Sequence, residues 1–274
     1  MIRSHKNLCV RNLYMKKFLA VLLILTATIF TGCGGEKEAS APKKTDGVFF
    51  VGIDDEFAPM TFRDEKGTIV GFDIDLAKEA AKRMGVTFNF RPIDWNGKES
   101  AITSGSVDMI WSACDIIDEY KEYMIFSKPY MDNRQIVLLR VDDESKINSE
   151  SDFAGKIVGT QSGSNSETYI KESEDLKKTF KDFKTYRSVK DAFIALNGGE
   201  IDLLVVDEIA ALYELKKSAD TFKIVDVTVG PVTKFGIGFR KNDTELRDRV
   251  QKVFDSMVED GTVKKIYEKW FHAT

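Results

Sequence analysis

Short apolar runs alternate with amphipathic stretches along the chain from residue 48 onward. The runs 48–53 (VFFVGI) and 107–111 (VDMIW) are rich in β-branched and aromatic residues, which predicts two strands. Between them, residues 77–84 place alanines and a methionine on one helical face and charged residues on the other, which predicts an amphipathic helix. Strands that alternate with helices in this way are typical of an α/β fold with parallel strands.

A second set of strands and helices begins near residue 157. The runs 157–160 and 201–206 predict strands, and the helix between them is expected to begin at a capping box of Ser188 with Asp191 and to end at the glycines 198–199. The last part of the chain predicts two more helices, whose apolar residues recur every three or four positions and should pack in the core. The repeated pattern indicates a second lobe.

Polar and aromatic residues stand where several of the predicted strands end. Asp54 follows the first strand, and Trp111 and Ser112 end the next. Asp207 follows the strand of the second set. Each carboxylate taken alone is more simply a helix cap or a loop residue. Ligands of open α/β sheets bind beyond the carboxyl ends of the strands, however, so these strand ends together predict a cleft to which both lobes contribute.

The start of the chain has the pattern of an export signal. Lys16 and Lys17 precede an apolar run at 18–30, which is short for a membrane-spanning helix. Gly32 and Cys33 follow the run. This arrangement resembles the signal of bacterial lipoproteins, in which the cysteine thiol is acylated.

We therefore expect residues 1–33 to be a signal peptide, with Met15 as an alternative start, and Cys33 to be lipidated. Residues 34–46 (GGEKEASAPKKTD) are polar and predict a flexible tether. Plain secretion, with Cys33 unmodified, is the alternative. The anchored protein is expected on the outer face of the cytoplasmic membrane, in a periplasm or at the cell surface, with the lipid as its only contact with the membrane.

The charge balance and the titratable residues argue against several classes of function. The 40 basic and 44 acidic residues are interspersed, with a net charge of −4, so no surface of one sign is expected to bind nucleic acid. His5 and His272 lie at opposite ends of the chain, and Cys9, Cys33 and Cys114 lack metal-ligand spacing. Common phosphate-loop, zinc-protease and hydrolase motifs are absent. We expect no metal, no cofactor and no catalytic residue.

The segment 71–84 (GFDIDLAKEAAKRM) carries the most specific pattern in the sequence. Over its whole length it resembles the signature of the bacterial extracellular solute-binding proteins of family 3, the polar amino-acid receptors of ABC importers. The resemblance continues in order through 51–60 (VGIDDEFAPM), 126–130 (FSKPY), 195–207 (ALNGGEIDLLVVD) and 260–271 (DGTVKKIYEKWF).

This resemblance implies a two-lobed periplasmic-binding-protein fold of type II, in which each lobe is a sheet flanked by helices and a two-strand hinge joins the lobes. Residues 47–137 with 231–274 would form the first lobe, and 138–230 the second. The resemblance further implies a monomer that captures an amino acid or a related small amine by hinge closure and is not an enzyme. Its protein partners would be the membrane permease and the ATPase of an importer.

The resemblance also implies which residues surround the ligand. Asp207 would hold the ligand's ammonium group, whereas Asp73 and Asp75 are expected to cap the helix of the signature segment. The other implied ligand-binding residues are Asp54 and Phe57 in the first loop, Trp95 in the next, Trp111 and Ser112 at a strand end, and Ser164, Asn165 and Ser166 in the second lobe.

Residues 112–120 (SACDIIDEY) depart from the family pattern. Where the family has a threonine-rich turn and an arginine that binds the ligand's α-carboxylate, this chain has Asp115, Ile117 and Tyr120. A tyrosine offers one neutral hydroxyl instead of a charged fork. Asp115 would also repel a carboxylate, by roughly 4 kcal/mol at about 4 Å and an effective dielectric of 20. We therefore expect an altered specificity, with Asp115 and Tyr120 among the ligand-binding residues.

Two interpretations of this segment follow. A carboxylate could still be bound by backbone N–H groups of the turn 161–166 (QSGSNS) or by an arginine from elsewhere, for which Arg91, Arg134 and Arg187 are the candidates. Alternatively, the pocket selects a cation, because carboxylates and aromatic faces form ammonium cages with about 0.5–2 kcal/mol for each cation–π contact. The residues of the cationic interpretation are Asp54, Asp115, Asp207, Phe57, Trp95, Trp111 and Tyr120.

Two other functions fit the same fold. Secreted cyclohexadienyl dehydratases resemble these receptors, and such an enzyme needs a general acid, for which Asp115 or Glu208 could serve by position. The other is a sensory ligand-binding module that signals through a separate membrane partner. The importer receptor needs no chemistry and is the function that the sequence favours.

Overall fold

The computed structural model of the chain describes residues 47–272. The predicted signal peptide, the alternative start at Met15, Cys33 and the tether lie outside these residues. Within the described range, no helix has the length and apolar character that crossing a membrane requires. The same residues contain no group of histidine, cysteine and acidic side chains arranged to hold a metal ion.

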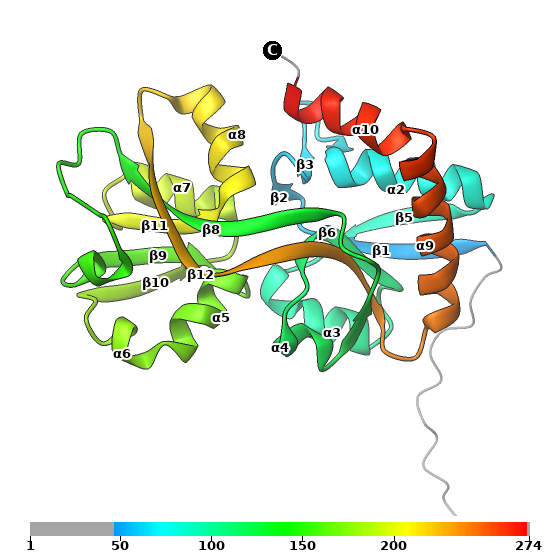
Figure 1. Ribbon diagram of the computed structural model, residues 1–274, viewed down its shortest axis with the longest axis horizontal. Coiled ribbons are helices and arrows are strands. Elements are labelled where there is room, and N and C mark those ends of the chain that lie inside the picture. Colours follow the sequence, from blue (N-terminus) through cyan, green and yellow to red (C-terminus); the bar gives the residue numbers. More distant parts are fainter. Residues whose placement is uncertain (1–46, 273–274) are drawn as a thin grey trace, which may run out of the picture. The chain divides into compact units, whose positions relative to one another are not determined.

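The strands belong to two sheets (Figure 1). A nine-stranded sheet has the order β10-β9-β11-β8-β12-β6-β1-β5, with β7 also paired to β12, and a small sheet has the order β2-β3-β4. The strands are β1 (Val48–Ile53), β2 (Glu56–Phe57), β3 (Thr61–Arg63), β4 (Ile69–Val70), β5 (Thr87–Pro92), β6 (Met109–Asp115), β7 (Met124–Phe126), β8 (Met131–Arg140), β9 (Ile157–Gln161), β10 (Asp182–Tyr186), β11 (Leu203–Asp207) and β12 (Phe222–Arg240).

Helices cover both faces of the large sheet. Apolar residues of α2, α7 and α9 belong to one buried cluster, and those of α5 and α3 belong to two others. The α-helices are α2 (Phe72–Met84), α3 (Lys98–Thr103), α4 (Asp118–Lys121), α5 (Asn165–Glu172), α6 (Glu174–Lys177), α7 (Val189–Asn197), α8 (Glu208–Ser218), α9 (Thr244–Glu259) and α10 (Thr262–Tyr267). Short 3-10 turns lie at Trp95–Gly97 and Glu150–Phe153, and a π-helical turn lies at Glu268–His272.

Two long strands join two groups of parallel strands. Strand β1 pairs in parallel with β5 and β6, and β9 pairs in parallel with β10 and β11. Between the groups, β8 and β12 pair with each other in antiparallel fashion, and each also pairs with one of the groups. Figure 1 shows the groups and their helices on either side of these two strands. The predicted two-lobed α/β fold is therefore confirmed.

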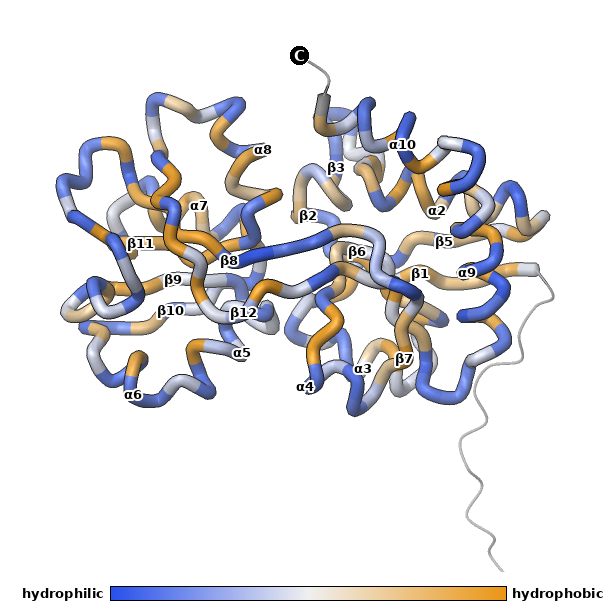
Figure 2. The backbone as a smooth tube through the Cα atoms, in the orientation of Figure 1, coloured by the Kyte–Doolittle hydropathy of each residue, from blue (hydrophilic) through white to orange (hydrophobic). Residues whose placement is uncertain are grey.

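The middle of the molecule is polar where β8 passes between the lobes. Figure 2 shows a hydrophilic stretch of β8 there, whereas the strands within each lobe are largely hydrophobic. Asn133 and Gln135 of this stretch are buried. Buried amides need hydrogen-bond partners, so this part of the sheet is expected to face other polar groups.

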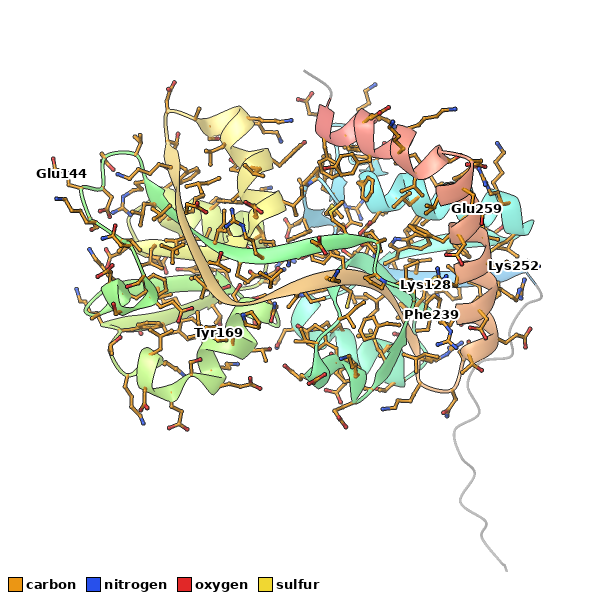
Figure 3. All side chains as sticks on the ribbon, in the orientation of Figure 1. Lys128, Glu144, Tyr169, Phe239, Lys252 and Glu259 are labelled. Atoms are coloured by element: carbon orange, nitrogen blue, oxygen red, sulfur yellow. The ribbon has the colours of Figure 1, made fainter. Side chains whose placement is uncertain are left out.

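A glycine lets β12 pass close beneath a helix of the second lobe. Gly230 has φ of 68°, and a Cβ atom there would lie 2.7 Å from the ring of Tyr169, which is labelled on α5 in Figure 3. The Tyr169 hydroxyl donates to Glu150 Oε2 at 3.0 Å, and the other oxygen of Glu150 accepts from the Gly230 N–H at 2.8 Å. Only glycine combines this backbone conformation with the close contact to the ring.

The predicted elements are found, but their ends differ from the predictions. The strand predicted at 48–53 is β1, and α7 begins after Ser188, whose hydroxyl accepts from the Asp191 N–H at 3.1 Å. The strand predicted at 107–111 runs instead from Met109 to Asp115, because its later residues pair with β12. Residues expected in a turn after the strand therefore belong to the sheet.

Candidate functional site

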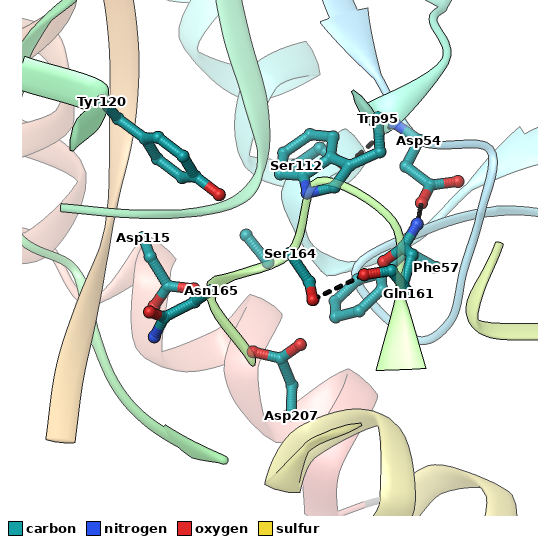
Figure 4. Close-up of a pocket in the computed structure, with 11 residues that line it drawn as sticks. Asp54, Phe57, Trp95, Ser112, Asp115, Tyr120, Gln161, Ser164, Asn165 and Asp207 are labelled. Atoms are coloured by element: carbon teal, nitrogen blue, oxygen red, sulfur yellow. Dashed lines mark hydrogen bonds between the residues drawn. The ribbon is translucent and has the colours of Figure 1, made fainter. Parts of the chain in front are cut away.

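A cavity lies at the carboxyl ends of the parallel strands β1, β6, β9 and β11 (Figure 4). With the lobes in contact, the free space in this cavity is about 10 Å³, roughly enough for one water molecule, so a larger ligand requires the lobes to separate. The lining residues are Asp54, Phe57, Trp95, Ser112, Ala113, Asp115 and Tyr120 from the first lobe, and Gln161, Ser164, Asn165 and Asp207 from the second. A ligand in this cavity would be small and would touch both lobes.

All predicted ligand-binding residues except Trp111 and Ser166 line the cavity. Successive side chains of a strand point to opposite faces, so Trp111 lies in the core beside Ser112, and its ring is 6.1 Å from that of Phe254. The Ser166 hydroxyl donates to Gln135 Oε1 at 2.5 Å. Both side chains stand behind the cavity wall, so their predicted contact with a ligand has no support in the lining.

Two lining residues were missed by the sequence analysis. Gln161 ends strand β9, and its Nε2 donates to Asp54 Oδ2 at 2.6 Å. Its position at a strand end is the signal that could have identified it. Ala113 has φ of 46°, a conformation that residues with a side chain rarely adopt, and no sequence pattern marks it.

Asp73 and Asp75 support the site from behind, but they do not cap α2 as expected. No side-chain hydrogen bond caps the start of this helix in the described structure. Instead, Asp73 Oδ2 accepts from the Ala113 N–H at 2.7 Å and from the Tyr130 hydroxyl at 2.9 Å. Asp75 Oδ2 accepts from Trp270 Nε1 at 2.9 Å. Asp73 therefore holds Ala113 in its unusual conformation at the cavity wall.

Two aspartates form a pair at one side of the cavity. Asn133 Nδ2 donates to Asp115 Oδ1 at 3.0 Å and to Asp207 Oδ1 at 2.5 Å. The Thr233 hydroxyl also donates to Asp115, and Gln135 Nε2 donates to Asp207 at 2.8 Å. Burial, followed by the charge of Asp207, raises the pKa of Asp115 to about 8, and burial also raises the pKa of Asp207. The polar stretch of β8 thus holds two carboxyl groups together.

A third buried aspartate lies on another side of the cavity. Asp54 accepts from the Glu56 N–H at 3.0 Å and from Gln161 Nε2. Burial raises the pKa of Asp54 to about 6. Among the described residues, no lysine, arginine or histidine forms a salt bridge with Asp54, Asp115 or Asp207. Their hydrogen bonds come from neutral donors, although the charge of Lys98 nearby also lowers the pKa of Asp115, so these carboxylates are available to a cationic ligand.

The buried cation nearest to this cavity is Lys98, which the sequence analysis did not identify. Its Nζ donates to the Gly163 carbonyl at 2.6 Å and lies 4.2 Å from the ring centre of Tyr120. The Tyr120 hydroxyl donates to the same carbonyl at 2.8 Å. Burial lowers the pKa of Lys98, and this lysine does not line the cavity. Its ammonium group therefore lies behind the Tyr120 ring and is hydrogen-bonded to the Gly163 carbonyl.

The three arginines proposed from the sequence lie elsewhere. None of them lines the cavity within the described structure. Arg91 lies over the ring of Phe50, Arg134 pairs with Glu208 and Asp226, and Arg187 pairs with Glu56. The start of α5 does reach the cavity through Ser164 and Asn165, but Ser164 Oγ already accepts from the Glu167 N–H at 3.2 Å.

Direct contacts between the lobes surround the cavity. Gly163 has φ of 73°, and a Cβ atom there would lie 2.6 Å from the Cα of Asn96, so the loop of the second lobe needs glycine to approach the first lobe this closely. The Thr168 hydroxyl donates to Glu119 Oε2 at 2.7 Å across the same boundary. The described structure therefore has the two lobes in contact around the cavity.

Asp115→Asn is expected to stabilise the ligand-free protein at high pH. The folded-state pKa of about 8 exceeds the ordinary value of 3.8, so the folded chain binds more protons than the unfolded chain between these values. The contribution of Asp115 to stability is therefore present near pH 4 and lost as the pH rises through 8. Asparagine has the shape of the protonated acid and removes this loss. We expect the free energy of unfolding to rise by about 1–3 kcal/mol at pH 8.5.

Urea unfolding at pH 5 and pH 8.5 measures this effect, and the gain should be much smaller at pH 5. Asp118→Asn is the control, because the Asp118 side chain is 97% exposed. The same stability change for Asp115→Asn at both pH values would contradict the assignment of a raised pKa.

Comparison with known proteins places the chain among proteins of this architecture. Residues 49–273 match the family described as bacterial extracellular solute-binding proteins, family 3. The L-cystine-binding protein TcyJ of Escherichia coli (strain K12) is 30% identical over 230 residues, which are 84% of this chain and 85% of that protein.

Two solved structures are similar to this chain. One is an ABC uptake transporter substrate-binding protein from Streptococcus pneumoniae with bound histidine, with a TM-score of 0.77 and 34% identity over 82% of this chain and 93% of that one. The other is an ancestral arginine-binding protein bound to arginine, with a TM-score of 0.77 and 37% identity over 83% of this chain and 100% of that one.

Proposed function

Because the chain belongs to the bacterial extracellular solute-binding proteins of family 3, we propose that it is the extracytoplasmic substrate-binding component of an ABC importer. It captures an amino acid or a related small amine between its lobes and delivers it to a membrane permease, and an ATPase drives the transport. The observation that carries this proposal is the buried cavity whose wall comes from the strand ends of both lobes. Relatives named for binding cystine, histidine and arginine support the class of ligand.

The two lobes act as rigid parts that close by bending the two long strands. The first lobe comprises residues 47–137 and 231–274, and the second comprises 138–230. The pairing of β8 with β12 between the two groups of parallel strands supports a two-strand connection, and β8 begins to pair with β11 of the second lobe at Gln135. The contacts of Gly163 with Lys98 and Tyr120 form when the lobes close and separate when they open.

The protein works as a monomer attached to the outer face of the cytoplasmic membrane. The apolar run 18–30 followed by Gly32 and Cys33 supports a lipid anchor, and the polar residues 34–46 support a tether. Mass spectrometry of the mature protein tests this part. A diacylglyceryl group on Cys33 is expected, and a mature chain that begins elsewhere without lipid would overturn the anchor.

Saturable binding with closure and without turnover is the expected behaviour of the purified protein. Isothermal calorimetry against amino acids and small amines measures the binding, and small-angle scattering with and without ligand measures the closure as a smaller radius of gyration. No binding of any amino acid or small amine would contradict the proposed function.

One observation favours a second function, a dehydratase. Asp115 lines the cavity, and burial raises its pKa to about 8, so it could donate a proton near neutral pH. Glu208, the other acid considered, forms an ion pair with Arg134 at 2.5 Å and does not line the cavity. Consumption of prephenate or arogenate by the purified protein would establish the enzyme, and no consumption is expected of the receptor.

A further inference from the structure

The cavity wall carries charge of one sign only. Its ionisable acids are Asp54, Asp115 and Asp207, and no basic side chain of the described structure is among the lining residues. These carboxyl groups accept hydrogen bonds from amides and hydroxyls and have no salt-bridge partner there. A group of buried acids without a cation is unfavourable in the ligand-free protein, and a bound cation would relieve it.

The acids are divided between two sides of the cavity. Asp115 and Asp207 share the Asn133 amide, whereas Asp54 is bonded to Gln161. Figure 4 shows Asp54 and Gln161 on one side and Asp115 with Asn165 on the other. Trp95 and Ser164 lie between the two sides in the same view, and Phe57 lies beside Gln161. The cavity therefore has two negative poles with an apolar aromatic wall between them.

Among the described lining residues, no side-chain cation is available to a ligand carboxylate. The Lys98 ammonium donates to the Gly163 carbonyl, and the Tyr120 hydroxyl donates to the same oxygen. The Glu167 carboxylate accepts from the Gly163 N–H at 2.6 Å and lies near the start of α5, where it opposes a second anion. A ligand carboxylate would meet three acids and no free cationic donor in the lining.

We propose that the ligand is a small diamine that carries an ammonium group at each end and no carboxylate, as in the decarboxylation product of a basic amino acid. This inference rests on the proposed function as a receptor and names its class of ligand. One ammonium binds to the Asp115–Asp207 pair and the other to Asp54. The methylene chain between them packs against Trp95 and Phe57, and these rings also face the ammonium groups.

The charges of the cavity agree with a dication. Two acids that share one site lose their protons in two steps, and the raised pKa of Asp115 keeps one proton on the pair near neutral pH. Asp54, with a pKa of about 6, is ionised near neutral pH, and an ammonium group bound to the pair would favour the ionised form of its carboxyl groups. Lys98 of α3 lies behind Tyr120 and is the cation that lowers the pKa of Asp115 from that side.

Matched pairs of ligands that differ only in the α-carboxylate test the inference. We would titrate the purified full chain at pH 8 with 1,5-diaminopentane and L-lysine, and with 1,4-diaminobutane and L-ornithine, in a calorimeter. Each diamine is expected to bind at least about 10-fold more tightly than its amino acid. Equal or tighter binding of the amino acids would overturn the assignment of a diamine ligand and leave the proposed receptor function intact. No binding of any compound of either class would overturn both.

A third comparison tests the two poles separately. 1-Aminopentane has one ammonium group, so it should bind at least about 10-fold more weakly than 1,5-diaminopentane. Asp54→Asn should weaken the binding of 1,5-diaminopentane by about 10-fold or more and leave the binding of 1-aminopentane nearly unchanged. Asp55→Asn is the matched control, because Asp55 pairs with Arg63 and does not line the cavity. If Asp54→Asn reduced the affinity for both amines equally, the two-pole arrangement would be refuted.

Discussion

Asp207→Asn is expected to weaken the binding of a diamine by about 30-fold to several thousand-fold, because removing one partner of a buried, hydrogen-bonded charge pair costs about 2–5 kcal/mol. Asp207 ends strand β11, accepts from Asn133 and Gln135, and has no cationic partner in the described structure. Asparagine keeps the shape of the side chain and removes only its charge. Calorimetric titration with 1,5-diaminopentane measures the change.

The loss should not arise from unfolding. Burial raises the pKa of Asp207, so the neutral asparagine is expected to leave the melting temperature of the ligand-free protein unchanged or higher. Asp118→Asn removes the same charge from an exposed position on α4 and should leave binding as it is. A loss below about 3-fold for Asp207→Asn would show that this carboxylate is not the main anchor of the ligand.

Lys98→Met, Asp115→Thr and Tyr120→Arg together are expected to make the cavity prefer L-lysine to 1,5-diaminopentane. The new guanidinium supplies the charged fork that a carboxylate needs, and the threonine removes a repelling charge. Hydrogen bonds to charged groups contribute about 1.5–3 kcal/mol, so L-lysine should bind at least about 10-fold more tightly than it binds to the unaltered chain. The diamine should bind more weakly, because one of its acids is gone.

Lys98 is included in this variant for a structural reason. Its Nζ lies 4.2 Å from the ring centre of Tyr120, so an arginine at that position would meet a like charge. The guanidinium can instead donate to the Gly163 carbonyl, which loses both of its present donors. The control replaces Tyr120 with methionine in the same background. A gain for L-lysine in the control as large as in the arginine variant would exclude the fork as the cause.

The strand ends were predictable from the sequence because they depend on a general rule. Asp54, Ser112 and Asp207 stand at the ends of β-rich runs, and the carboxyl ends of parallel strands meet in space. The family resemblance identified Trp95 and the turn 161–166 of the second lobe. No local sequence pattern would have placed them beside these strand ends. The α/β class followed from the alternation of strands and helices alone.

The errors arose where a residue's direction depends on contacts that are distant in sequence. Trp111 stands next to Ser112 in the chain, but the pleat turns the two side chains to opposite faces, and only the packing against α9 decides which faces the cavity. Pairing of β6 with β12 extends the strand to Asp115. The sequence marks neither the helix that covers one face nor the strand that pairs at the edge.

The partners of the acids could not be predicted for the same reason. Asn133 and Gln135 look like surface residues of a polar strand, and they become partners of Asp115 and Asp207 only because β8 crosses between the lobes. Lys98 resembles a solvent-exposed residue of a short helix, yet it reaches a carbonyl of the opposite lobe. Burial of polar residues between lobes leaves no periodic signal in the sequence.

The ratio of the dissociation constants of 1,5-diaminopentane and L-lysine, measured by calorimetry at pH 8 on the unaltered chain, tests most directly whether this cavity selects cations. We predict that the diamine is favoured by at least about 10-fold, and that the ratio reverses in the variant with Lys98→Met, Asp115→Thr and Tyr120→Arg. A ratio that favours L-lysine in the unaltered chain would contradict a cavity whose acids exclude carboxylates.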